Sequence, residues 1–248
     1  MTVADHEKLV QQIGQRVQEV REEIAQAAAR SGRDATAVRL VAVTKTHPPE
    51  LLAAAVEAGA REIGENYLQE AEDKFLALGW PSAGIDHPPV VRHAIGHIQT
   101  NKIRLALQWF EVIETIDSLR LAERLDTAAA ALGRTVPVLL QVNISNEPTK
   151  YGFFSEEIEG VLHRVANLTH IRVDGLMTIG RFEPDPEAAR GEFQALRTLR
   201  DRLRAVAPSG MCFDELSMGM SHDFPVAIEE GATIVRVGSR LFGSRPDK

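Results

Sequence analysis

The chain has 248 residues, of which 44% are hydrophobic and 25% charged; this is typical of a globular protein with a full core, at a length that one α/β barrel can fill. The 28 basic residues against 35 acidic ones give a net charge of −7, which argues against a nucleic-acid-binding face. No stretch approaches the roughly 20 apolar residues of a membrane span, and the first residues lack the apolar core of a signal peptide, so we expect a cytoplasmic protein.

The first predicted element is an amphipathic helix over residues 6–31, because Leu9, Ile13, Val17 and Val20 recur at three- and four-residue steps. Asp5 is its candidate N-cap. After this helix, short apolar runs alternate with helical patterns. Eight strands are predicted, over residues 39–44, 61–64, 90–95, 111–116, 136–142, 171–176, 212–216 and 233–237. Helices are predicted between most of them, over residues 49–58, 66–78, 100–108, 118–132, 155–167, 187–206 and 223–230.

Strands that are apolar on both faces and separated by helices pair in parallel through right-handed crossovers. Eight such units close into a barrel, so we predict an α/β fold: a single (β/α)8 TIM barrel with an added long N-terminal helix, forming one domain over residues 1–248. We expect that helix to cover the bottom or the flank of the barrel. The competing topology is a doubly wound open sheet, but its usual G-x-G-x-x-G turn after the first strand is absent.

Lys45 follows the first predicted strand and precedes Pro48 and Pro49, which start a new element. A lysine that is partly removed from water has a lowered pKa, and its neutral amine can attack the carbonyl of an aldehyde. A solvated lysine at a strand end is the simpler interpretation of this residue taken alone.

Two other sets of residues could be mistaken for reactive sites. His93 and His97 have the spacing of a metal-binding pair, but Gly96 lies between them and no carboxylate is near in the sequence, so we predict no metal site. Cys212 is the single cysteine and lies beside Phe213. We predict that it is packed in the core and is not a nucleophile.

The seventh and eighth predicted strands lead into small and hydroxyl residues, LSMGMS at 216–221 and VRVGS at 235–239. Glycines let a backbone approach a phosphate closely, serine hydroxyls donate hydrogen bonds, and helix N-terminal amides favour anions. Strand eight of a barrel lies beside strand one. An amine at Lys45 and an anion site at Ser221, Gly238 and Ser239 would therefore share one mouth, which indicates a phosphorylated aldehyde as the ligand.

These segments also carry a resemblance to a known family. From about residue 38 to residue 245 the chain resembles the YggS/PROSC family of pyridoxal phosphate homeostasis proteins, which is related to the N-terminal domain of alanine racemase. The segments that match, in the family's order, are VTKT at 43–46, GENY at 64–67, HAIG at 93–96, QTNK at 99–102, NIS at 143–145, GLM at 175–177, LSMGMS at 216–221 and VRVG at 235–238.

The resemblance implies a barrel that holds pyridoxal 5'-phosphate (PLP) as an aldimine on Lys45. Ser221, Gly238 and Ser239 would hold the phosphate, with Ser239 standing where many members have threonine. Two further residues would line the ring and imine side of the site: Asn66 and Met220. Ser217 fits the site less clearly, because a structural serine in a tight turn explains it equally well.

Arg236 aligns with the arginine that faces the pyridine nitrogen in the family; an arginine with a surface partner is the simpler interpretation. A guanidinium keeps its protons and cannot accept a hydrogen bond from a pyridinium, so the ring remains a weak electron sink. The chain ends at Lys248, soon after the last predicted barrel element, and we expect the second domain of the racemases to be missing. We therefore predict a carrier with little or no turnover.

The alternatives are a PLP-dependent amino-acid racemase of low activity and a lysine aldolase that acts on a phosphorylated sugar. For the carrier, the expected partners are PLP and the apo forms of PLP-dependent enzymes, and the relatives imply a monomer. Lys150, on the loop after the fifth strand, is either a solvated lysine or an amine that takes up PLP from Lys45 during delivery.

Overall fold

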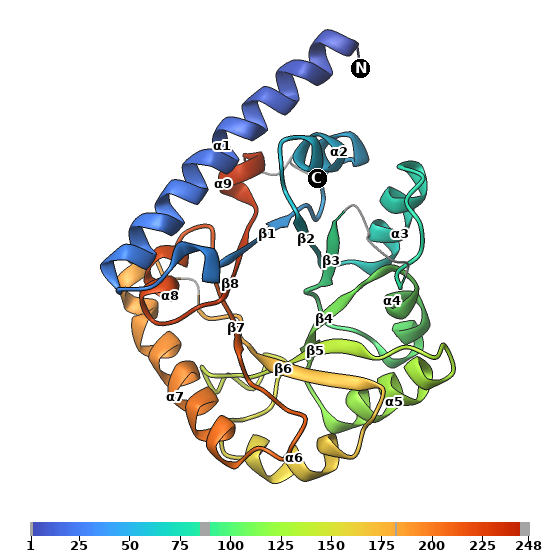
Figure 1. The fold of residues 1–248 in the computed structure, drawn as a ribbon, viewed down its shortest axis with the longest axis vertical. Helices are drawn as coiled ribbons and strands as arrows, with labels where there is room; N and C mark the ends of the chain where they lie inside the picture. The colour runs from blue at the N-terminus through green and yellow to red at the C-terminus, as the bar shows by residue number, and fades with distance from the viewer. Residues whose placement is uncertain (1, 85–89, 182, 244–248) are drawn as a thin grey trace.

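The strands form a closed barrel in the computed structural model, which describes residues 2–84, 90–181 and 183–243. Each strand pairs in parallel with its neighbours in chain order, and β8 returns to pair with β1 (Figure 1). This confirms the predicted barrel, and the open-sheet alternative is wrong. The strands are β1 Arg39–Val43, β2 Glu62–Glu65, β3 Val91–Ala94, β4 Val112–Ile116, β5 Val136–Gln141, β6 Ile171–Met177, β7 Glu215–Met220 and β8 Ile234–Val237.

Helices surround the barrel in the order that the sequence predicts. The α-helices are α1 Val3–Arg30, α2 Pro49–Glu57, α3 Leu68–Ala77, α4 Ile103–Trp109, α5 Leu119–Ala130, α6 Ile158–Ala166, α7 Arg190–Val206, α8 Phe224–Glu229 and α9 Ser239–Phe242. Short 3-10 helices are η1 Ala35–Ala37, η2 Thr100–Lys102 and η3 Pro186–Ala189. No helix in these described ranges is both long and apolar enough to cross a membrane.

The inside of the barrel contains a small apolar layer that is separate from the main core. Its members are buried and come from strands that are far apart around the ring: Val41, Leu139, Met177 and Ile234. Side chains from β1 and β5 can meet only across the interior. The alternate residues of these strands, such as Ala42 and Val235, belong to the larger core between barrel and helices, as the period of two in a strand requires.

Helix α1 lies along the flank of the barrel and packs against α8, α2 and α9 (Figure 1). The side chains that repeat every three or four residues are buried from Ile13 onward. The expected Asp5 cap is wrong in detail. Thr2 is the N-cap and Asp5 is its capping-box partner, so the two side chains satisfy amides of the first turn reciprocally.

Strand β7 lies further along the chain than predicted. It covers Glu215–Met220, so Ser217 is inside a strand, where it is fully buried, and not in a turn. Phe213 is buried in the left-handed region at a φ of 48°, and this bend delays the start of the strand. The prediction for Cys212 is also wrong, because its side chain is exposed.

Candidate functional site

The predicted site residues all lie at the C-terminal ends of four consecutive strands, β7, β8, β1 and β2. In the β-ladders Met220 pairs with Arg236, Ala42 with Val237, and Val43 with Gly64. Lys45, Gly238 and Asn66 each follow these paired positions by one or two residues. The closed topology therefore brings together residues that are almost 200 positions apart in the sequence.

Lys45 is half-buried in the turn that follows β1. The next residue, Thr46, has a φ of 66°, which is unusual for a β-branched side chain. The amide of Thr46 donates to Glu70 of α3, at 2.5 Å. Before the lysine, the amide of Thr44 donates to the carbonyl of Gly64 on β2, at 3.1 Å. The backbone is thus held on both sides of Lys45.

A buried ion cluster that the sequence did not reveal supports this turn. The ammonium of Lys74 donates to the Thr44 carbonyl at 2.7 Å, to Glu65 at 2.8 Å and to Glu70 at 2.5 Å. The hydroxyl of Thr44 also donates to Glu65. Glu70 and Lys74 are four residues apart in a helix, which in the sequence is indistinguishable from a solvated surface pair.

Glu65 is the deepest member of this cluster. Burial raises the pKa of its carboxyl group, against the opposing effect of the Lys74 charge. One of its oxygens, Oε2, has no hydrogen-bond partner among the described residues. A buried carboxylate with one unpaired oxygen depends strongly on the cation that remains beside it.

Asn66, directly after β2, has a buried Oδ1 atom that also has no hydrogen-bond partner in the described part of the chain. Gly96 packs against its backbone so closely that an added Cβ would come within 2.2 Å of the Asn66 carbonyl oxygen. Burying an unpaired amide oxygen is costly. Asn66 therefore offers the kind of unsatisfied polar atom that a polar ligand at the mouth would pair.

The predicted phosphate segments touch each other. The Gly238 amide donates to the Ser221 hydroxyl at 3.0 Å, which joins the end of β8 to the turn after β7. Met220 ends β7, and its amide donates to Asp223 at 2.6 Å. Ser239 is exposed as the first residue of α9. These hydroxyl and amide groups are the donor types that bind a phosphate.

Arg236 is buried inside the barrel and is not a surface arginine. Its Nη1 donates to the Ser217 hydroxyl at 2.5 Å, and its Nη2 donates to the carbonyl of Thr178 at 2.7 Å. Burial lowers the pKa of the guanidinium, while Glu114, at 3.9 Å, raises it. An arginine retains its charge under these conditions.

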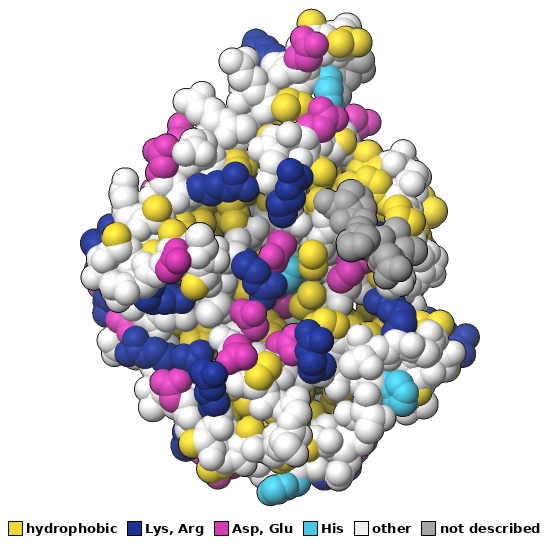
Figure 2. Space-filling model, viewed as in Figure 1, with side chains coloured by type: hydrophobic (Ala, Val, Ile, Leu, Met, Phe, Trp, Pro, Cys, Tyr) yellow, Lys and Arg dark blue, Asp and Glu magenta, His cyan; other side chains and the backbone are white. Residues whose placement is uncertain are grey.

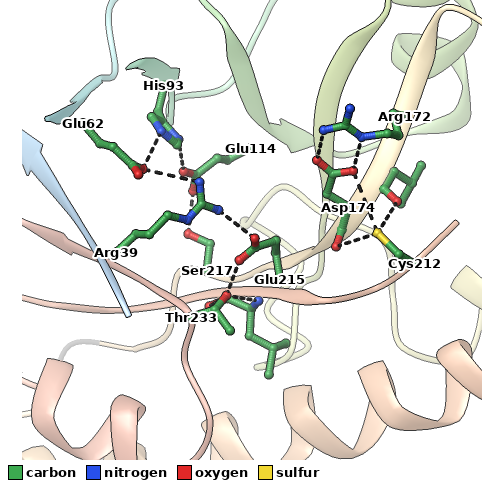
Figure 3. A network of polar contacts seen from close by, with 12 residues as sticks. Arg39, Glu62, His93, Glu114, Arg172, Asp174, Cys212, Glu215, Ser217 and Thr233 are labelled. Atoms are coloured by element: carbon green, nitrogen blue, oxygen red, sulfur yellow. Dashed lines mark hydrogen bonds and ion pairs between the residues drawn. The ribbon is translucent and has the colours of Figure 1, made fainter. Parts of the chain in front are cut away.

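A polar network that includes Ser217, the partner of Arg236, shares the barrel interior with the apolar layer; Figure 3 shows its members other than Arg236. His93 Nδ1 hydrogen-bonds to Glu114 at 2.7 Å, and its Nε2 lies 3.0 Å from Glu62 in an ion pair. Arg39 contacts Glu62 at 3.6 Å and Glu215 at 2.9 Å. Glu114 accepts a hydrogen bond from the Ser217 hydroxyl at 2.5 Å.

Carboxylates do lie beside His93 and His97, contrary to the expectation from the sequence. Folding brings two carboxylates against His93, and His97 Nδ1 lies 2.7 Å from Asp117. The two imidazoles lie in different settings, because His97 stacks on Tyr151 at the rim while His93 is buried in the interior. No group of three or more candidate metal ligands occurs among residues 2–84, 90–181 and 183–243.

Two residues outside the mouth complete the comparison with the sequence. Lys150 lies on the loop after β5, where its ammonium is 2.8 Å from Glu147. Cys212 lies near Asp174 (Figure 3), and burial together with that carboxylate raises the pKa of its thiol. A raised thiol pKa disfavours the thiolate, and the absence of a nucleophilic role for Cys212 stays a prediction.

Comparisons with known proteins agree on one family. Residues 16–246 match the family model described as alanine racemase, N-terminal domain. A pyridoxal phosphate homeostasis protein of Aquifex aeolicus is 38% identical over 231 residues, which is 93% of this chain and 97% of that protein. One of Escherichia coli strain K12 is 38% identical over 236 residues, or 94% of this chain and 97% of that protein.

Solved structures give the same result. PipY of Synechococcus elongatus PCC7942 without PLP superposes with a TM-score of 0.82 at 36% identity, covering 93% of this chain and 100% of PipY. PipY with PLP bound superposes with a TM-score of 0.77 at 37% identity, covering 89% of this chain and 100% of PipY. The alanine racemase of Bartonella henselae gives 0.66 at 15% identity, covering 96% of this chain and 60% of the racemase, which shows a shared fold alone.

Proposed function

The chain belongs to the pyridoxal phosphate homeostasis proteins within the alanine racemase N-terminal domain family, and from this membership we propose that it binds PLP as a reversible aldimine on Lys45. Its role would be to store PLP and deliver it inside the cell, with little or no turnover. The observation that carries the proposal is the position of Lys45, half-buried at the end of β1 beside the contact between Ser221 and Gly238.

The residues at the mouth fit this cofactor in chemical type. PLP supplies an aldehyde that bonds to a primary amine, a phosphate, and a ring that withdraws electrons. Lys45 would supply the amine, and Ser221, Gly238 and Ser239 would supply hydroxyl and amide donors for the phosphate. Met220 would contact the ring. A PLP-bound structure of PipY, 37% identical, supports PLP as the ligand.

Asn66 supports the same assignment through its unpaired Oδ1. A buried amide oxygen gains a hydrogen bond if a ligand hydroxyl approaches it, and PLP carries a ring hydroxyl. Asn66 would therefore hold the ring on the side of β2, opposite the phosphate donors of β7 and β8.

Arg236 favours a carrier over an enzyme. Its guanidinium would face the pyridine nitrogen and cannot accept a proton from it, so the ring nitrogen would stay unprotonated. Carbanion chemistry is then weakly stabilised, and the bond at Lys45 is the main covalent event. We propose that the protein acts as a cytoplasmic monomer and passes PLP to the apo forms of PLP-dependent enzymes.

The first test is an absorption spectrum of the protein with PLP, followed by borohydride reduction and peptide mass mapping. A band of a lysine-bound aldehyde and a pyridoxyl group on Lys45 are expected for the wild type, and neither for Lys45→Ala. Lys150→Ala is the matched control, since it removes an amine from the loop after β5, on the other side of the barrel. Labelling at another lysine, or none at all, would contradict the proposal.

A second test separates the carrier from a low-activity racemase. The protein is loaded with PLP and mixed either with an apoenzyme or with amino acids in deuterated water. We expect transfer of PLP to the apoenzyme and negligible exchange of the α-proton. Sustained α-proton exchange by the wild type, absent from Lys45→Ala, would identify a racemase instead. Loss of transfer in Lys150→Ala would assign that lysine to delivery.

A further inference from the structure

A continuous line of polar contacts crosses the barrel interior beneath Arg236 and ends on its guanidinium. Starting from the first residues of β1 and β2, it passes to His93 on β3, Glu114 on β4, Ser217 on β7 and Arg236 on β8. Figure 3 shows this line as far as Ser217. Of these residues, only Arg236 has a part in the proposed binding of PLP. That proposal gives no role to the other members of the line.

The direction of each hydrogen bond is fixed by the chemistry of the partners. A carboxylate only accepts, so the Ser217 hydroxyl must donate its hydrogen bond to Glu114, at 2.5 Å. Arginine only donates, so the Ser217 oxygen must accept from Nη1, also at 2.5 Å. Ser217 is completely buried and has no alternative orientation that keeps both contacts.

The protonation state of His93 determines the direction of the next hydrogen bond in the line, the one between His93 and Glu114. Burial lowers the pKa of His93, but the hydrogen bond to Glu114 and the charges of Glu114 and Glu62 raise it to about 9. Burial raises the pKa of the Glu114 carboxyl group, but His93, Arg236 and Ser217 together lower it by more. Glu114 therefore remains a carboxylate. The other charged groups of the interior, Arg39 and Glu215, neutralise each other at 2.9 Å. The cationic His93 is therefore paired with two carboxylates, Glu62 and Glu114.

We propose that Glu114 and Ser217 are positioning residues that fix the guanidinium of Arg236 in the pose that faces the PLP ring, an inference that rests on the proposed function. An arginine side chain has four rotatable bonds and loses substantial entropy when it is ordered. Ser217 and the Thr178 carbonyl hold two of its nitrogens from different strands, which defines the plane of the guanidinium. Without Ser217 one of these two anchors is lost, and PLP binding must order the side chain itself.

The test compares PLP affinity by absorption titration in Ser217→Ala, Glu114→Gln and the wild type. A hydrogen bond to a charged group contributes enough that we expect a dissociation constant about ten times larger in each variant. Thr233→Val is the matched control. Its hydroxyl also bonds to a strand glutamate, Glu215, at 2.5 Å, but at the far end of the network from Arg236, and we expect a change of less than about twofold.

A double-mutant cycle decides whether the effect acts through Arg236. In an Arg236→Gln background, Ser217→Ala should change the dissociation constant by less than about twofold, because the group that it positions is gone. The second readout is the 15N chemical shift of the ring nitrogen of labelled PLP. It should move in Ser217→Ala and Arg236→Gln and stay in place in Thr233→Val.

The outcomes separate this inference from the proposed function. If the wild type traps PLP on Lys45 but Ser217→Ala and Glu114→Gln match Thr233→Val, the inference is wrong and the function stands. If Ser217→Ala weakens binding equally with and without Arg236, its role is structural and the inference is also wrong. If the wild type traps no PLP, both fail. Thermal unfolding of each apo variant shows which are folded, and Ser217→Cys replaces Ser217→Ala if the latter is not.

Discussion

At the scale of single residues, Lys45 owes its setting to neighbours that are not themselves reactive. Lys74 is buried and bonds to the carbonyl of Thr44, and Glu70 accepts the amide of Thr46. The peptide groups on both sides of Lys45 are therefore tied to one ion cluster on β2 and α3. A shift of this cluster would move the amine.

Lys74→Met tests this dependence. The change leaves Glu65 and Glu70 without their cation, and we expect the free energy of unfolding to fall by about 3 kcal/mol. Borohydride trapping of PLP on Lys45 should also become slower, because the turn loses its support. Urea unfolding and timed trapping measure the two effects. Lys8→Met, on an exposed turn of α1, is the control, and equal behaviour of the two variants would refute the assignment.

The raised pKa of His93 leads to a second prediction, which concerns how the free energy of unfolding depends on pH. The pKa of this residue is raised to about 9 in the folded protein, above the value of about 6.5 for an unfolded chain. The folded state therefore binds more protons between these values. The stabilisation from His93 is complete below about pH 6.5 and is lost as the pH rises through about 9.

We expect the difference in free energy of unfolding between the wild type and His93→Gln to shrink steadily over this pH range. Denaturant unfolding at several pH values measures it, and subtracting the variant removes the contribution of other titrating groups. A difference that does not vary with pH would mean that His93 is neutral in the folded protein.

At the scale of elements, β7 determines how the site is assembled. It extends to Met220, and Gly219 within it has a φ of 90°. A Cβ at this position would lie 2.5 Å from the Cβ of Ala227 on α8. The glycine thus permits both the bend of the strand and the close approach of the following helix, and it precedes Met220 and Ser221 at the mouth.

Gly219→Ala should lower the free energy of unfolding by about 3 kcal/mol, since backbone strain and a steric clash add together. Gly32→Ala is a control of the same chemistry. Gly32 has a φ of 67° but nothing within 4 Å of an added Cβ, so a loss of about 1 kcal/mol is expected. Thermal or urea unfolding compares them. Equal losses would show that the contact with Ala227 is relieved at no cost.

At the scale of the whole molecule, the barrel interior is divided between an apolar layer and a charged one. Acidic and basic side chains gather over the middle of the ring in Figure 2. This agrees with the partial exposure of Arg39, Glu62 and Glu215, the first residues of their strands. The charged line therefore runs from one end of the barrel toward Arg236 near the other, past the apolar layer.

The apolar layer is small, so each member should matter to closure of the ring. Leu139→Ala removes a buried side chain that clusters with side chains of three other strands, and we expect the free energy of unfolding to fall by about 3 kcal/mol. Leu132→Ala is the control, at a side chain that is 54% exposed, with a change within about 0.5 kcal/mol. Chemical unfolding measures both. A small loss in Leu139→Ala would show that the interior repacks.

The sequence alone determined the order of strands and helices, the barrel, and the group of residues around Lys45. Local periodicity predicts the strands and helices, and the rule that strand eight lies beside strand one brings Ser221, Gly238 and Ser239 to Lys45. The family resemblance added Asn66, Met220 and Arg236. The predicted start of β7 was wrong because the bend at Phe213 results from tertiary packing, which the strand propensity of the residues does not reveal. For the same reason Cys212, adjacent to that buried ring, was wrongly placed in the core.

Only the tertiary structure revealed the partners of Lys74 and His93. Glu70 and Lys74 look like a solvated pair in one helix, and the carboxylates around His93 come from β2 and β4, at positions 31 residues before and 21 residues after it. A charged side chain in a sequence is read as exposed unless its partners are known. The partners of His93 meet only when β2, β3 and β4 pair side by side in the barrel. Those of Lys74 meet only when helix α3 packs on the ends of β1 and β2. In both places the charges are buried and must be balanced.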